Sequence, residues 1–246
     1  MEVHAHTHTA RKKWTHYFWE FLMLFLAVFC GFLAEFQLEH KIERERKKVY
    51  IQSMIEDLQK DTANLTLIIK DFQSLDITID TVLNLFPKLS SGYNDTLIRN
   101  ILATNGYPDF IYSDRTMQQL KNSGAMRLIR NKNVTDGIVH YDSNIRDLVD
   151  IDITGLVNDF NQFNEFRREL FDYQNLKIDM KLKSISQMEN GNKNYLLKSD
   201  KASLGKFYNN LSEIQDYYFM VMEKEMALKK EATQLIALLK KEYHLK

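Results

Sequence analysis

The feature that most constrains this chain is an apolar run near its N-terminus, Phe18 to Phe36, with the sequence FWEFLMLFLAVFCGFLAEF. The run is 19 residues long, and its two ionisable residues, Glu20 and Glu35, lie close to its ends. A helix rises about 1.5 Å per residue, so a run of this length matches the ~30 Å hydrocarbon core of a bilayer. We therefore predict three parts: a short polar tail (1–16), a transmembrane anchor (17–38), and a helical stalk and bundle domain (39–246).

The aromatic residues at the start of the run fit the same interpretation. Trp14, Tyr17 and Trp19 stand where an interfacial aromatic belt is expected. Glu20 and Glu35 are separated by about 22 Å along a helix, so each acid can reach its own interface. This spacing favours interfacial anchoring over a proton path through the membrane.

The anchor is expected to remain uncleaved. Phe29 precedes Cys30 and is too large for a lipoprotein processing site, and Phe32 stands where a signal peptidase needs a small residue. Ala27 and Gly31 form one small-xxx-small pair, a pattern found where two membrane helices pack together. The span thus offers a route to a homo-oligomer.

Composition points to an all-α fold outside the anchor. The chain has only 8 glycines and 2 prolines, and this scarcity of helix breakers favours long helices. Its 33 basic residues are balanced by 33 acidic residues, which gives no general attraction to nucleic acid. The single cysteine, Cys30, lies in the span, so intrachain disulfides and cysteine zinc sites are excluded.

The residues after the anchor continue as one long helix that ends at Pro87. Apolar residues recur there at alternating three- and four-residue steps, the pattern of a coiled coil or a long bundle helix. These positions are Ile51, Ile55, Leu58, Thr62, Leu65, Ile69, Phe72, Ile79, Leu83 and Phe86. The helix could pack against later helices of the same chain or against a second copy.

Short elements are expected between Pro87 and residue 133. They are a helix over 95–103, an extended stretch over 110–112, a helix over 117–121 capped by Ser113 or Asp114, a turn at Ser123-Gly124 and a helix over 125–130. A second long helix begins near Val134, bends at Gly155, continues through Leu176, Met180 and Leu182, and ends at 190–192. The last helix covers about 200–243. The sum is an antiparallel helical bundle with short helices inserted.

Two blocks of sequence resemble a family of uncharacterised single-span bacterial inner-membrane proteins. One is KVYIQSMIEDLQKD, from Lys48 to Asp61, and the other is TMQQLKNSGAMRLIRNK, from Thr116 to Lys132. The resemblance covers roughly residues 15–145, and the C-terminal half matches only as helix. It implies a bacterial inner membrane location with the bulk of the chain in the periplasm, and it implies no activity. The histidine-bearing tail and the phenylalanine-rich span differ from the commoner members.

Candidate metal ligands are sparse. His4, His6 and His8 alternate in the tail and could share a transition metal if extended, but a plain polar tail is the simpler interpretation. Glu56 and its neighbours Asp57 and Asp61 could bind a cation or act as acid and base. A solvated or inter-helix salt-bridged helix face is favoured, and no metal or cofactor is predicted.

A small basic patch follows the predicted turn and forms a possible interaction corner. It consists of Ser123, Gly124, Arg127 and Arg130. The patch could hold an anion at the start of the short helix. The alternative is a packing corner between helices, in which Gly124 adopts a positive φ.

The sequence predicts a non-enzymatic, membrane-anchored helical scaffold or accessory subunit of a cell-envelope protein complex. Its expected partners are membrane lipid, other envelope proteins and a second copy through the span and stalk, with no nucleic acid. The alternative is a sensor of a small molecule or of the envelope state, with a ligand-binding bundle. A closed pocket of convergent polar groups between the long helices would favour the sensor, and a filled bundle would favour the scaffold. No catalytic constellation is recognisable.

Overall fold

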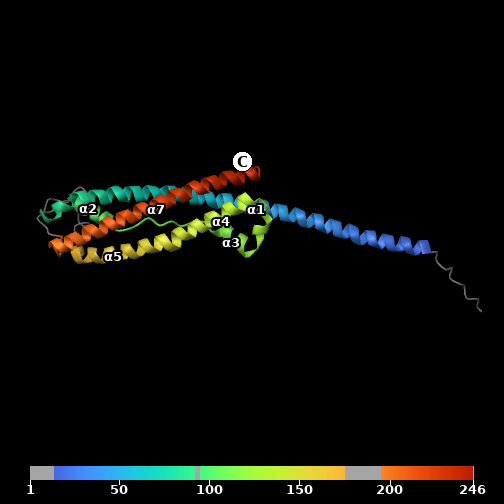
Figure 1. Cartoon of the computed structure of the whole chain (residues 1–246), viewed down its shortest axis with the longest axis horizontal. Helices are drawn as coiled ribbons and strands as arrows, with labels where there is room; N and C mark the ends of the chain where they lie inside the picture. The colour runs from blue at the N-terminus through green and yellow to red at the C-terminus, as the bar shows by residue number, and fades with distance from the viewer. Residues whose placement is uncertain (1–13, 92–94, 175–194, 246) are drawn as a thin grey trace, which may run out of the picture. The chain divides into compact units, whose positions relative to one another are not determined.

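The computed structural model describes residues 14–91, 95–174 and 195–245, and these residues form an all-α protein (Figure 1). The chain divides into two compact units, one up to Tyr50 and the other from Ile51 onward. The first helix, α1 (Trp14–Leu85), begins in the first unit and ends in the second. The described residues include one helix that is long and apolar enough to cross a membrane, and this helix contains the predicted anchor.

The predicted end of α1 is confirmed. The α-helix stops at Leu85, two residues before Pro87, and a 3₁₀ helix, η1 (Phe86–Ser91), follows. Proline has no backbone N–H to donate, and its ring clashes with the carbonyl four residues earlier, so the α-helix cannot continue through it.

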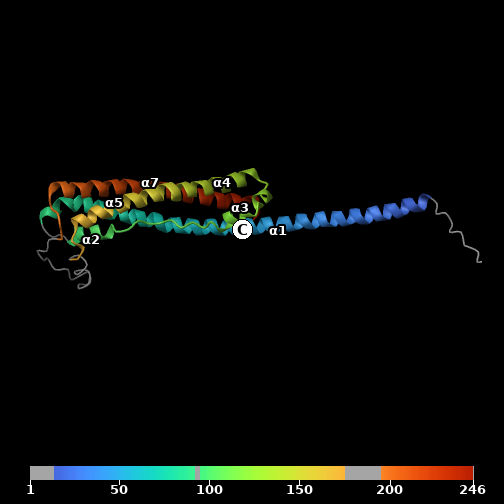
Figure 2. The same ribbon diagram turned by 90° about the horizontal axis from the view of Figure 1, so that it is seen from below.

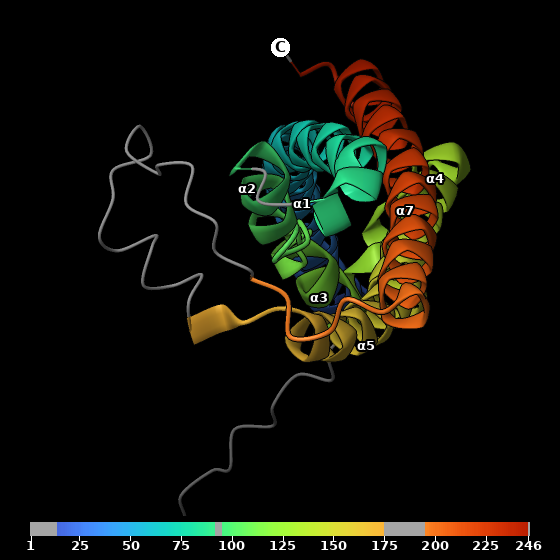
Figure 3. The same cartoon turned by 90° about the vertical axis from the view of Figure 1, so that its left-hand side faces the viewer.

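The second unit is a bundle of long helices (Figures 2 and 3). Alongside the part of α1 from Ile51 onward run α4 (Lys132–Asp147), α5 (Thr154–Leu170) and α7 (Lys201–Glu242). A π-helical turn, η3 (Leu148–Ile153), joins α4 to α5, so these two elements form nearly one continuous rod. The predicted helical bundle is therefore present, with α7 beginning after Asp200 as expected.

Side-chain contacts establish that α7 is antiparallel to α1 and to α4. The ring of Phe86, just after α1, stacks on Phe207 near the start of α7, and Phe72 packs edge-on against Tyr218. Residue numbers thus fall along α1 as they rise along α7. His140 of α4 lies 2.6 Å from Glu231 of α7, and Asn131, just before α4, donates to Glu242 at the end of α7, so these two helices also run in opposite directions.

Core positions follow the predicted three- and four-residue spacing. On α1 the predicted residues Ile51, Ile55, Leu58, Leu65, Ile69, Phe72 and Ile79 are buried, whereas Thr62, Leu83 and Phe86 are half-buried. On α7 the buried residues include Phe207, Leu211, Ile214, Tyr218, Val221, Leu228, Leu235 and Leu239. The seam of α1 within the second unit is thus covered by helices of the same chain.

Three short elements position the corner described below. They are α2 (Asp95–Ala103), which has the predicted bounds, α3 (Arg115–Asn122), and a 3₁₀ helix, η2 (Ala125–Leu128). Residues 110–112 are non-helical, as predicted, and lead from α2 to α3. Gly124 joins α3 to η2 with φ of 64°, a conformation that costs glycine little because it has no Cβ.

The long helix predicted from Val134 onward is interrupted at Phe171. α5 ends at Leu170, and Phe171 adopts an extended conformation that forms an isolated antiparallel bridge with Leu196. Burial of Phe171 against Phe207 turns the chain out of its helix, although the apolar spacing continues. The predicted core residues Leu176, Met180 and Leu182, and the predicted terminator at 190–192, lie outside the described residues.

The predicted bend near Gly155 coincides with an irregular turn. The π-helical turn η3 ends two residues earlier, and such turns insert an extra residue into a helix. A methyl group at Gly155 would collide with the hydroxyl of Tyr217 on α7. Glycine at this position therefore allows close approach of α5 and α7.

Candidate functional site: a polar corner between α1, α3 and α4

Asp57 of α1 is the centre of a buried hydrogen-bond network. Its side chain is only 3% exposed. One carboxylate oxygen accepts hydrogen bonds from the backbone N–H (3.0 Å) and the hydroxyl of Thr116. The other oxygen accepts from the guanidinium of Arg115 at 3.0 Å. Each carboxylate oxygen therefore has a donor, with neutral groups on one oxygen and a charged group on the other, as a buried charge requires.

Asp57 also performs the capping role that the sequence assigned elsewhere. The first backbone N–H groups of a helix have no partner within the helix. Asp114 occupies the N-cap position of α3, one of the two positions predicted, but its side chain makes no capping hydrogen bond. The predicted side-chain cap from Asp114 is therefore wrong, and the N–H of Thr116 donates instead to a carboxylate from α1.

Asp61 lies one turn further along α1 and fixes two other segments. It is 2% exposed and accepts hydrogen bonds from the backbone N–H of Ser113 at 2.7 Å and from the hydroxyl of Tyr141 at 3.0 Å. Burial raises the pKa of Asp61, while the bonds from Ser113 and Tyr141 oppose this rise. Burial, together with the adjacent Asp61 carboxyl, also raises the pKa of the Tyr141 phenol. The phenol therefore stays protonated and keeps donating.

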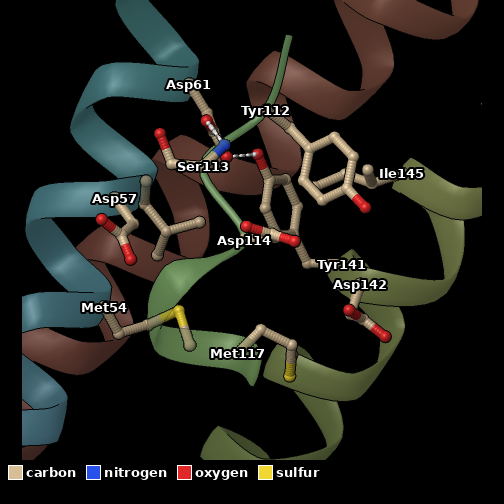
Figure 4. Close-up of a pocket in the computed structure, with 11 residues that line it drawn as sticks. Met54, Asp57, Asp61, Tyr112, Ser113, Asp114, Met117, Tyr141, Asp142 and Ile145 are labelled. Atoms are coloured by element: carbon tan, nitrogen blue, oxygen red, sulfur yellow. Dashed lines mark hydrogen bonds between the residues drawn. The ribbon is translucent and has the colours of Figure 1, made fainter. Parts of the chain in front are cut away.

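Asp142 of α4 supplies the third acidic group of the corner. It accepts from Lys121 at 2.7 Å and from Arg146 at 2.8 Å, so α3 and α4 are joined by charge. The residues around this network line a small cavity of about 20 Å³, which has room for about one water molecule (Figure 4). With the acids engaged by donors, the arrangement is suited to holding three elements together.

The sequence predicted that this acidic face is either solvated or salt-bridged between helices. Glu56 is exposed and lies 3.9 Å from Arg115, whereas Asp57 and Asp61 are buried between helices. The predicted inter-helix salt bridge is present between Asp57 and Arg115. Among the described residues no group of three His, Cys, Asp or Glu side chains could hold a metal ion, and His4, His6 and His8 lie outside them.

The predicted interaction corner adjoins this network at the end of α3. Gly124 has the positive φ that the packing interpretation requires. The hydroxyl of Ser123 donates to the Gln119 carbonyl at 2.6 Å and accepts from the Ala125 N–H at 3.3 Å. Arg127 and Arg130 are both exposed. Ser123 and Gly124 thus build the turn, and the two arginines remain accessible.

The predicted anchor residues lie on the first part of α1. Trp14, Tyr17 and Trp19 are 82%, 56% and 61% exposed, and Glu20 lies 3.0 Å from His16, one turn earlier. Gly31 and Glu35 are also exposed. Between Phe18 and Phe36 every side chain except that of Leu22 is exposed, so the described part of the chain leaves this apolar surface uncovered.

Two buried charged residues were missed by sequence reasoning. Glu225 of α7 is fully buried, and neither carboxylate oxygen has a hydrogen-bond partner in the described part of the chain. Burial, and secondarily the charge of Asp109, raises its pKa to about 8. Arg167 of α5 is 2% exposed, donates from Nη2 to the Asn105 side chain, and lies over the rings of Phe163 and Tyr173.

A local signal for Glu225 was present in the sequence. Tyr218, Val221 and Leu228 are buried at helical spacing, and Glu225 falls within the same stripe. An acid inside an apolar stripe is the pattern that predicts a buried ionisable group. Asp57 and Asp61 likewise fall within the apolar stripe of α1, which indicates that they are buried. Their hydrogen-bond donors come from residues 113–141, and the spacing along α1 cannot reveal these.

No protein family, curated protein or solved structure matches this chain. The functional argument therefore depends on the site and the anchor alone.

Proposed function

We propose that this protein is a non-enzymatic, membrane-anchored helical scaffold or accessory subunit of a cell-envelope complex. Residues 17–38 would cross a bacterial inner membrane, and the bundle would bind other envelope proteins on the periplasmic side. The observation that carries the proposal is the uncovered apolar surface of Phe18 to Phe36, which continues in the same helix into a packed bundle. Apolar surface of this extent is stable in lipid and costly in water.

The partner would bind an exposed apolar surface of the bundle. Leu67 on α1 is 63% exposed and Ile111 is 75% exposed. The side chain of Asn64, one turn before Leu67, donates to the Ile111 carbonyl at 2.8 Å, so residues 47 positions apart meet here. Exposed apolar side chains from two segments at one place are suited to contact with a partner.

The sensor alternative receives less support. A metabolite pocket usually has several hundred Å³ of space lined by a few polar groups. The corner cavity has about 20 Å³, and the carboxylates of Asp57 and Asp61 beside it already accept hydrogen bonds from the protein. A ligand at this corner would have to break the bonds that hold α3 to α1.

The test is affinity capture of the full-length protein from its native membrane after crosslinking, followed by mass spectrometry. We expect reproducible envelope proteins crosslinked near Leu67 and Ile111, and we expect the Leu67→Lys/Ile111→Lys variant to lose them. Ile77→Lys is the matched control, because Ile77 is also exposed (67%) on α1. Recovery of the wild-type protein with no other protein attached would overturn the scaffold proposal.

The orientation has its own test. In a Cys30→Ser background, a cysteine placed at the exposed Ser123 should react with a membrane-impermeant maleimide applied to cells whose outer membrane has been permeabilised. Labelling only after the inner membrane is opened would place the bundle in the cytoplasm.

A further inference from the structure

The second unit carries a strongly basic surface at one end. Residues 125–135 contain Arg127, Arg130 and Lys132 and no acid, and residues 239–245 contain Lys240 and Lys241 with one acid, Glu242. The two segments meet in the fold, because the Asn131 side chain donates to Glu242 at 2.7 Å. Since basic and acidic residues are equal in the whole chain, this excess is local.

Helix stability does not explain two of these charges. Lys132 is the first residue of α4, and Arg130 lies just before it. The N-terminus of a helix carries partial positive charge, so cations there are unfavourable. Both residues are exposed, as is Arg127. The charges therefore add to a local positive potential at the surface of this end.

The basic end is the end of the second unit at which the chain enters from the anchor. Asp57, two turns after Ile51, bonds to α3, and α3 leads through Gly124 to Arg127. The bond from Asn131 to Glu242 places the C-terminal end of α7 at the start of α4. Only residues 39–50 separate Ile51 from the span, and these twelve residues, which are helical in α1, extend about 18 Å. The far end of α7, about 60 Å away, has no such tether.

We propose that this basic end, Arg127, Arg130, Lys132, Lys240 and Lys241, binds the headgroups of anionic lipids and holds the bundle against the membrane surface. The inference rests on the anchor of the proposed function. Basic side chains near an anionic bilayer each strengthen attachment by roughly fivefold, and the effect falls within a Debye length. The bundle would then present Leu67 and Ile111 at a fixed height to its protein partner.

The experiment uses the full chain in nanodiscs of neutral lipid and of neutral lipid mixed with phosphatidylglycerol, with hydrogen exchange as the readout. We expect hydrogen exchange over 125–135 and 239–245 to be slower in the anionic discs than in the neutral discs. This difference should disappear in about 1 M NaCl, because the Debye length then falls to ~3 Å. The Arg127→Gln/Arg130→Gln/Lys132→Gln variant should lose this protection. The matched control, Lys60→Gln/Lys70→Gln/Lys201→Gln, removes three exposed charges elsewhere and should keep it.

The possible failures are distinguishable. Equal exchange in both kinds of disc, with the chain incorporated in each, would overturn the lipid-binding surface and leave the anchor standing. A chain that does not enter discs at all would overturn the anchor and this inference together. If the two segments are protected in native vesicles but not in anionic discs that contain this chain alone, the basic end binds a protein partner, and the inference is also overturned.

Discussion

Buried acids accept hydrogen bonds at the corner of the bundle, whereas the buried acid in the middle of the bundle accepts none from the described residues. At the corner, Asp57 and Asp61 accept hydrogen bonds from Ser113, Thr116 and Tyr141 and from a cation, Arg115. In the middle of α7, Glu225 is equally buried but neither of its oxygens is bonded within the described residues. A buried carboxylate is stable only if it is paired, and otherwise it keeps its proton.

The difference shows what each acid does for the fold. The corner acids join α1 to α3 and α4, so removing one leaves donors on other elements unsatisfied. Glu225 forms no hydrogen bond with any other described residue, and its raised pKa means that it is tolerated mainly in its neutral form. The comparison therefore predicts that replacing corner acids destabilises the protein and that replacing Glu225 stabilises it.

The largest effect is expected for Asp57→Ala. It leaves the buried N–H and hydroxyl of Thr116 and the Arg115 guanidinium without their acceptor, so the free energy of unfolding should fall by about 3–4 kcal/mol. Urea unfolding of the full chain in mild detergent, followed by circular dichroism, measures this. The control is Glu56→Ala, one residue away and exposed, which should change stability by less than about 0.5 kcal/mol. Similar losses for both variants would break the comparison.

Glu225 should make stability depend on pH. Its pKa is about 8 in the folded protein and 4.5 when unfolded, so between these values the folded state holds the proton and the unfolded state loses it. Stability should therefore fall by about 2 kcal/mol from about pH 5 to about pH 7, with little further loss above pH 8. Glu225→Gln should remove this part of the slope, and the difference between the two proteins isolates it from Asp61. Parallel pH profiles would contradict the account.

Tyr141→Phe sharpens the contrast within the corner. It removes only the hydroxyl that donates to Asp61, and Asp61 keeps the N–H of Ser113. A hydrogen bond to a charged group contributes about 1.5–3 kcal/mol, so we expect a loss of about 1.5 kcal/mol in urea unfolding. Tyr112→Phe, in the same cavity lining, is the control because its hydroxyl does not bond to Asp61. No loss in Tyr141→Phe would mean that this bond is dispensable.

The smallest effect is expected at the turn itself. Gly124→Ala places a Cβ on a residue with φ of 64°, which should cost about 1 kcal/mol. Gly205→Ala, in α7 with open space around the added methyl, should instead raise stability by up to about 1 kcal/mol. Thermal unfolding of both variants decides whether the corner depends on this turn as well as on its acids.

Much of the fold followed from local sequence signals. The end of α1 at Pro87, the bounds of α2, the positive φ of Gly124 and the start of α7 after Asp200 each depend on residues that act within one or two turns. Such signals need no knowledge of distant contacts. The all-α bundle followed in the same way from apolar spacing and few helix breakers.

The features that were missed depend on contacts between distant segments. The cap of α3 comes from Asp57, 59 residues before Thr116, which no local pattern around Asp114 reveals. The helix end at Leu170 depends on the pairing of Phe171 with Leu196. The possible interaction corner, the scaffold role and the orientation in the membrane remain predictions.

The central claim is that the apolar part of α1 lies in a membrane, and the single cysteine of the chain tests it directly. Cys30 lies in the middle of the predicted span and is exposed on the surface of the protein. If the span is in lipid, a hydrophilic, membrane-impermeant maleimide should not label Cys30 in intact native membranes and should label it fully after denaturation in detergent. Rapid labelling of Cys30 in intact membranes would contradict the anchor and every proposal that depends on it.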